Sequence, residues 1–163
     1  MQIVKYPNKI LNTKCETIHE NSAELKKLIS DMFDTLRSTG GGVGLAAPQV
    51  GVNLRLFITK RFFIDGVYIN PVIVSHSEET ASGPEGCLSI PGRNYNIRRY
   101  TWIKVTYLNE RFEKVEKKYT GFPAILFQHE YDHLRGITLK ERSGEVAWVK
   151  ENYLKDFKDY NLL

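Results

Sequence analysis

Residues 122–134 read Phe122-Pro123-Ala124-Ile125-Leu126-Phe127-Gln128-His129-Glu130-Tyr131-Asp132-His133-Leu134, which combines apolar residues with an H-E-x-x-H motif. Residues four apart lie on one face of a helix, so His129 and His133 can direct both imidazoles at one metal ion. Glu130 lies beside them, where its carboxylate can take a proton from a water molecule. Gly136 offers a stop to the helix. Four apolar residues indicate that this helix is buried, namely Phe122, Ile125, Leu126 and Leu134.

Two histidines do not complete a catalytic metal site, which usually has three protein ligands and one open position. Zincin proteases take the third ligand from further along the chain, but no extended H-E-x-x-H-x-x-G-x-x-H motif follows here. Cys87, in the segment Glu85-Gly86-Cys87-Leu88-Ser89, is an upstream candidate. A lone cysteine is more often a small buried hydrophobe, and that is our interpretation of Cys15. For Cys87, the H-E-x-x-H motif in the same small protein favours a ligand instead.

A third segment reads Gly42-Val43-Gly44-Leu45-Ala46-Ala47-Pro48-Gln49. It lacks the Gly-Lys-Ser/Thr ending of a phosphate loop. By itself it is most simply a tight connection between a helix and a strand. Gln49 adds a chemical alternative, because its amide N–H can donate a hydrogen bond to a developing oxyanion without carrying charge.

Length and composition indicate one globular domain over residues 1–163. The chain is 42% hydrophobic and 26% charged, and no apolar run approaches the roughly 20 residues that span a bilayer. We see no signal peptide and two cysteines only, so we expect a cytoplasmic protein without disulfides. The net charge of +4 predicts a mildly basic surface with, at most, a weak attraction to RNA-rich partners, since no nucleic-acid motif is present.

The order of periodic segments predicts an α+β fold. Apolar spacing favours a helix over 21–38, with Asn21 and Glu24 resembling a capping box. A last amphipathic helix is expected over 145–159. Between them, alternating or branched residues predict strands at 54–59, 67–74, 102–108 and 112–119, with a turn at 109–111. We therefore expect antiparallel β-sheets packed around a central metal-binding helix, with an N-terminal and a C-terminal helix.

Taken together and in this order, the three segments resemble the signature motifs of the peptide deformylase family, G-x-G-L-A-A-x-Q, E-G-C-L-S and H-E-x-D-H. Here these motifs are residues 42–49, 85–89 and 129–133, and each is complete. The resemblance extends over roughly residues 3–140. Residues 141–163 carry no motif that can be transferred.

The resemblance implies a metal-dependent hydrolase acting on linear amides. The family removes the formyl group from the N-terminal formylmethionine of newly synthesised polypeptides and releases formate. Carried over, the metal ligands are Cys87, His129 and His133, and Glu130 is the general base and acid. The side-chain amide of Gln49 and the backbone N–H of Leu88 would stabilise the oxyanion.

The resemblance also implies the metal, the pocket and the partners. One divalent ion is expected, Fe²⁺ in the cell, with Zn²⁺, Ni²⁺ or Co²⁺ able to replace it. Glu85 and Arg99 match positions that support the site. Partners would be N-formylmethionyl nascent peptides and, weakly, the ribosome, with neither membrane nor direct nucleic-acid recognition and with a monomer as the default. Positions matching the substrate pocket are Val43, Gly44, Glu85, Leu88, Phe122, Ile125 and Leu126, although the aliphatic members could equally be core residues.

Two other hypotheses stay open at this point. The first is a zincin-like endopeptidase, which the Cys87 segment disfavours. The second is a non-catalytic protein with a structural metal. Structural zinc sites usually have four protein ligands, so three ligands beside an intact Glu130 favour a catalytic site.

Overall fold

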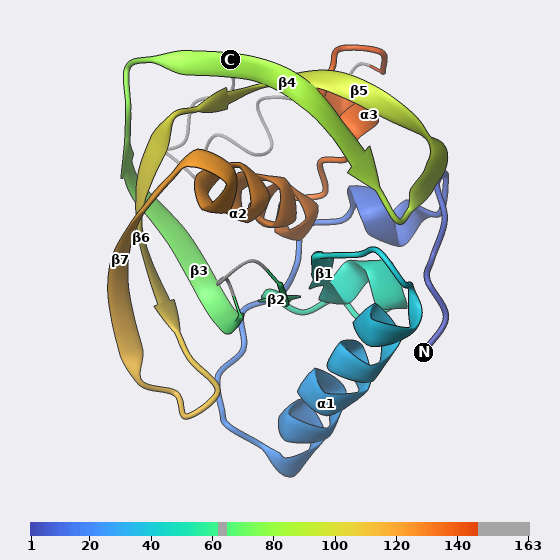
Figure 1. The fold of residues 1–163 in the computed structure, drawn as a ribbon. Coiled ribbons are helices and arrows are strands. Elements are labelled where there is room, and N and C mark those ends of the chain that lie inside the picture. The colour runs from blue at the N-terminus through green and yellow to red at the C-terminus, as the bar shows by residue number, and fades with distance from the viewer. Residues whose placement is uncertain (62–64, 147–163) are drawn as a thin grey trace.

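In a computed structural model of the chain, residues 1–61 and 65–146 are described. Helix α2 (Gly121–Leu134) lies at the centre, between a five-stranded antiparallel sheet of order β1-β2-β3-β6-β7 and the antiparallel hairpin β4-β5, which arches over it (Figure 1). The other elements are η1 (Lys9–Asn12), α1 (Ala23–Ser38), β1 (Gly44–Ala46), η2 (Ala47–Val50), β2 (Leu56–Thr59), β3 (Gly66–His76), β4 (Thr80–Cys87), β5 (Ile90–Tyr100), β6 (Trp102–Leu108), β7 (Lys114–Thr120) and α3 (Leu139–Arg142). The predicted α+β class, with antiparallel sheets around this helix, is confirmed.

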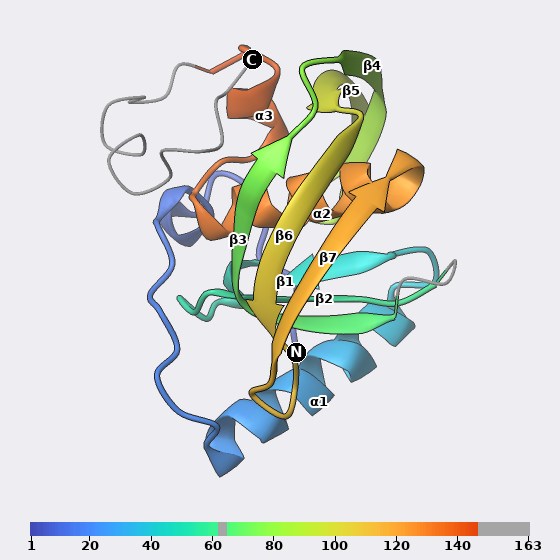
Figure 2. The same cartoon turned by 90° about the vertical axis from the view of Figure 1, so that its left-hand side faces the viewer.

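The five-stranded sheet is covered on both faces where β1 and β2 lie. Successive side chains of a strand point to opposite faces, so Leu56 and Ile58 pack in the cluster of α1, whereas Phe57 packs in the cluster of α2. All four residues of β2 are buried for this reason. Figure 2 shows α1 beneath the sheet and α2 behind it. The cores on the two faces hold the sheet as a rigid support for α2.

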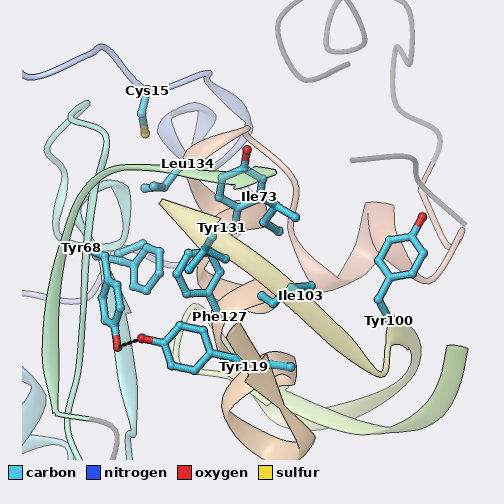
Figure 3. Close-up of a cluster of buried hydrophobic side chains, with 13 residues drawn as sticks. Cys15, Tyr68, Ile73, Tyr100, Ile103, Tyr119, Phe127, Tyr131 and Leu134 are labelled. Atoms are coloured by element: carbon cyan, nitrogen blue, oxygen red, sulfur yellow. Dashed lines mark hydrogen bonds between the residues drawn. The ribbon is translucent and has the colours of Figure 1, made fainter. Parts of the chain in front are cut away.

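The α2 side of the core is largely aromatic. Phe127 stands edge-on to the rings of Phe57 and Tyr68, with centroids 5.0 and 5.5 Å apart. The hydroxyls of Tyr119 and Tyr68 meet at 3.5 Å inside this cluster (Figure 3). Cys15 is buried here as well, as expected for a structural cysteine, and burial raises the pKa of its thiol to about 12.

Helix α1 matches the predicted span except at its cap. The Oγ of Ser22 accepts a hydrogen bond from the Leu25 N–H at 3.1 Å, so the cap is Ser22 and not Asn21. The Asn21–Glu24 capping box was therefore wrong by one residue. Leu25, Ile29 and Met32 of the predicted apolar face are buried against the sheet.

Helix α2 ends where the sequence predicted, because the backbone turns at Gly136. Gly136 has φ of +73°, and a Cβ at this position would lie 2.7 Å from the backbone carbon of Asn12. In the middle of the helix, Gln128 forms hydrogen bonds with both the N–H and the carbonyl of Tyr100, each at 3.0 Å. These contacts fix α2 relative to the β5–β6 corner.

The hairpin of β4 and β5 is the main element that the sequence did not predict. Thr80–Cys87 contains glycine, proline and polar residues and lacks an apolar alternation, because most of its side chains are exposed or half-buried. Its pairing places Cys87 opposite Ile90 across the two-residue turn at Leu88 and Ser89. The hairpin thereby brings Cys87 to the end of a strand that curves round α2.

The four strands that the sequence predicted occur in the structure within a few residues of their expected bounds, whereas β1 was not predicted as a strand. Strand β6 has the predicted bounds, β7 begins two residues later than expected, and β3 is longer at its C-terminal end. Of the helix expected over 145–159, residues 147–159 lie outside the described residues. No helix in the described part of the chain is long and apolar enough to cross a membrane.

Candidate metal centre

The donor atoms of three residues converge beside α2. Cys87 comes from the end of β4, and His129 and His133 come from one face of α2. Their ligand atoms all lie within 4.8 Å of one another, and Cys87 Sγ is 3.4 Å from His133 Nε2. The structure therefore brings the three sequence-predicted ligands together in an arrangement that can hold one metal ion.

The electrostatics of this group favour a positive charge between the donors. Burial alone would raise the pKa of the Cys87 thiol, but His133 and His129 beside it hold that pKa well below its usual range. Burial would lower the pKa of His129, yet its hydrogen bonds to Cys87 and Glu85 raise that pKa well above the usual value. A divalent cation supplies the positive charge that this donor set favours, so thiolate and imidazoles fit a metal ion.

Glu85 orients one of the imidazoles. Its Oε1 lies 2.9 Å from His129 Nδ1, which selects the tautomer with the proton on Nδ1 and leaves Nε2 for a metal. Arg99 holds Glu85 in turn by two parallel hydrogen bonds, each of 2.9 Å. Burial would raise the pKa of Glu85, but Arg99 and His129 hold it at about 2. Glu85 is therefore a carboxylate at neutral pH.

We expect Arg99→Ala to destabilise the fold and weaken metal retention. Arg99 is 3% exposed and is paired with Glu85 and Asp132, so its loss leaves Glu85 without a guanidinium partner and Asp132 with Arg142 alone of its two arginine partners. Breaking a buried ion pair typically costs about 3–5 kcal/mol. Thermal unfolding and metal content check this, and a variant with the parent's melting temperature and metal content would contradict it.

Glu130 lies directly beside Gly44 of β1. It is 3% exposed, and a Cβ placed on Gly44 would lie 2.5 Å from its Oε1, so only glycine permits this approach. Its Oε2 is buried and has no hydrogen-bond partner among the described residues. Burial raises the pKa of Glu130, although His129 and His133 oppose that shift. Such a carboxylate is suited to exchange a proton with a water molecule or a substrate.

Gln49 has a fixed orientation behind Cys87. Its Oε1 accepts a hydrogen bond from the Ala46 N–H at 2.9 Å, so its Nε2 points the other way. There the Nε2 lies 3.6 Å from Cys87 Sγ and 3.2 Å from Ser89 Oγ. Gln49 is 1% exposed and is not part of the cavity wall. Its Nε2 donor therefore approaches the three metal-ligand candidates beside the Cys87 thiol.

An open cavity of about 490 Å³ lies against this group. Phe122 and Ile125, which the sequence indicated as buried, are instead 46% exposed and half-buried, respectively, because they form part of the cavity wall. The wall also includes Cys87, His129 and Glu130. All seven positions matched to the substrate pocket line it, namely Val43, Gly44, Glu85, Leu88, Phe122, Ile125 and Leu126.

The sequence did not predict that Asp132 and Arg142 belong to the site. Asp132 bonds to Arg99 Nη1 at 2.6 Å, and Arg142 bonds to Asp132 from α3. Asp132 is the aspartate of the H-E-x-D-H motif, and as a charge inside a largely apolar helix it requires a partner, but neither signal identifies that partner. Arg142 lies in the segment without any motif and gave no signal.

The chain is similar to known proteins over most of its length. The family model described as polypeptide deformylase matches residues 1–147. The peptide deformylase of Aquifex aeolicus is 44% identical over 146 residues, which is 86% of this chain and 85% of that protein. The crystal structure of the Thermotoga maritima peptide deformylase superposes with a TM-score of 0.83 at 38% identity, covering 86% of this chain and 95% of that one.

A second solved structure carries a ligand. It is a class I type b peptide deformylase from Acinetobacter baumannii with Met-Ala-Ser bound, with a TM-score of 0.83 and 35% identity, covering 87% of this chain and 97% of that one. The family match spans more than half of the chain, and the relatives exceed 30% identity over most of its length. This chain belongs to the polypeptide deformylase family.

Proposed function

We propose that the cavity beside Cys87, His129 and His133 is the catalytic site at which this chain removes the formyl group from the N-terminal formylmethionine of newly synthesised polypeptides. The observation that carries the proposal is the convergence of the three donors within 4.8 Å of one another at the wall of a cavity that also contains Glu130. Three protein donors leave a coordination position open for chemistry, whereas a structural zinc site usually has four. The reaction is hydrolysis of a linear amide, with formate as a product.

Cys87, His129 and His133 are the proposed ligands of one divalent ion. When bound, the ion would supply a Lewis acid for the formyl oxygen and would lower the pKa of a water molecule. We propose Fe²⁺ in the cell, with Zn²⁺, Ni²⁺ or Co²⁺ in the purified protein, since imidazole and thiolate suit all of these ions. Cys87 requires a reducing environment to remain a thiolate ligand.

Glu130 is the proposed proton carrier. Its carboxylate accepts a proton from the attacking water and delivers it to the nitrogen of the leaving amine. The unpartnered Oε2 and the close approach to Gly44 support this role, because together they hold the carboxylate at the edge of the cavity without tying up both oxygens. Gln49 Nε2 and the Leu88 N–H are the proposed donors to the oxyanion.

The cavity wall supports methionine as the side chain next to the formyl group. Val43, Phe122, Ile125 and Leu126 give an apolar surface that suits an unbranched thioether side chain. The Acinetobacter baumannii relative binds Met-Ala-Ser, the peptide that deformylation of formyl-Met-Ala-Ser leaves behind. We therefore propose formylmethionyl peptides as substrates of this chain.

We further propose a setting for the reaction. Residues 1–163 would act as one catalytic domain, as a monomer in the cytoplasm, where nascent polypeptides are made. A weak association with the ribosome is supported by the net charge of +4, which favours anionic surfaces. Neither membrane binding nor direct recognition of nucleic acid is proposed.

The formate assay tests the proposed reaction. The metal-loaded protein is incubated with formyl-Met-Ala-Ser and, separately, with an unformylated peptide that has internal bonds. We expect formate from the first and no cleavage of the second. Cleavage of internal bonds without formate release would identify an endopeptidase and contradict the proposal.

Gln49→Ala tests the oxyanion donor. We expect this variant to keep its metal and to lose about 10²–10³-fold in turnover, because one preorganised donor is removed. The variant is compared with the parent for metal content and for formate release at saturating peptide. Turnover equal to that of the parent would remove Gln49 from the mechanism.

A further inference from the structure

Arg142 is an arginine buried at the end of α3, in the part of the chain that carries no sequence motif. Its side chain is only 5% exposed. Its Nε donates to Asp132 Oδ2 at 2.8 Å and its Nη2 donates to Asp132 Oδ1. Charged side chains are rarely buried without such partners, and this two-point contact fixes the carboxylate of Asp132 in one orientation.

Asp132 connects Arg142 to the candidate metal centre. Its Oδ2 also accepts from Arg99 Nη1 at 2.6 Å, so one oxygen lies between two guanidinium groups. Arg99 forms the double hydrogen bond with Glu85, and Glu85 Oε1 lies 2.9 Å from His129 Nδ1. A continuous row of alternating charges therefore runs from α3 to a metal-site imidazole.

We propose that Arg142 is a positioning residue for the metal centre. It holds Asp132 so that Arg99 stays aligned with Glu85 and the imidazole of His129 stays directed at the metal. The inference rests on the ligand set proposed above. It extends the site to α3, which has no residue in the cavity wall.

Charge balance gives the physical reason. Asp132 and Glu85 are two buried carboxylates, and Arg99 and Arg142 are two buried guanidinium groups, so the row is neutral as a whole. Without Arg142, Arg99 is the guanidinium of the row that bonds to both carboxylates, while Arg135 also attracts Asp132 by its charge. Attraction towards Asp132 would then draw Arg99 away from the double hydrogen bond that holds Glu85.

Arg142 could instead serve only to anchor α3. The chain offers a matched control that separates this structural role from the proposed one. Glu141 is also buried on α3, and its Oε2 accepts from the Thr138 N–H at 2.8 Å and from Thr138 Oγ1 at 2.5 Å. Glu141→Ala removes this capping interaction and loosens α3. It removes none of the side chains that form the row from Arg142 to His129.

The experiment measures release of Zn²⁺ from the loaded protein to a chromogenic chelator, below the melting temperature of every variant. We expect Arg142→Met to release Zn²⁺ about tenfold faster than the parent, in the range found for residues that support metal ligands. Arg142→Lys should be intermediate, because it keeps the charge but not the two-point contact. Glu141→Ala should melt at a lower temperature and release Zn²⁺ at the parent rate.

Two results would overturn the proposal. The first is that Arg142→Met releases Zn²⁺ at the parent rate. If Arg142→Met does not fold, the same result from Arg142→Lys would overturn the proposal. The second is release from Glu141→Ala that is accelerated as much as from the Arg142 variants, which would leave Arg142 as an anchor of α3 only. Failure of the ligand set itself would look different, since Cys87→Ala would then hold Zn²⁺ as firmly as the parent.

Discussion

Glu130→Gln is expected to bind metal like the parent and to lose about 10³-fold or more of its turnover with formyl-Met-Ala-Ser. Positioned acid–base groups typically contribute about 10²–10⁴-fold, and Glu130 is proposed to act twice, as base and then as acid. Glutamine has nearly the same shape, so it fits the narrow space beside Gly44. It cannot accept the proton of a water molecule.

The measurement combines metal content with formate release at saturating peptide. Glu130→Asp is the matched variant, because it keeps the carboxylate and withdraws it by one methylene. We expect it to recover part of the lost turnover. Turnover of Glu130→Gln within tenfold of the parent would show that the proton is carried by another group.

Cys87→Ala is expected to lose both metal and activity. The thiol of Cys87 has a pKa well below its usual range, because His133 and His129 outweigh the effect of burial, so it is available as a thiolate ligand. Alanine leaves two imidazoles, fewer than the three protein ligands usual for a catalytic site. After dialysis we expect much less than one metal ion per chain, and formate release reduced in proportion.

Cys15 provides the control within the same chain. It is buried in the aromatic core, where burial raises the pKa of its thiol to about 12. Cys15→Ala should therefore keep its metal and its activity and lose only packing. Equal metal loss in the two cysteine variants, or full metal retention in Cys87→Ala, would contradict the assignment of Cys87.

The sequence predicted those parts of the site that depend on local spacing. The four-residue separation of His129 and His133 needs only a helix, and Gly136 ends that helix with a positive φ as expected. The motifs around Gln49 and Cys87 indicated which other segments lie beside this helix. The structure places both of them there.

The sequence did not predict features that depend on tertiary packing. The β4 strand has no apolar alternation because one side of it borders the cavity and solvent, so the hairpin that carries Cys87 was missed. Phe122 has the composition of a core residue, and only the position of the cavity explains its exposure. Arg142 is connected to His129 through three other side chains, those of Asp132, Arg99 and Glu85, and such a relation leaves no local pattern.

The most direct test of the metal centre is the anomalous difference map of a crystal of the metal-loaded protein, recorded at the absorption edge of the metal. We expect one ion bound by Cys87 Sγ and by imidazole nitrogens of His129 and His133, with Glu130 beside it but not bound to it. We also expect a non-protein ligand at the remaining coordination position. An ion that does not contact Cys87, or a fourth protein ligand that closes the site, would contradict the proposed catalytic metal centre.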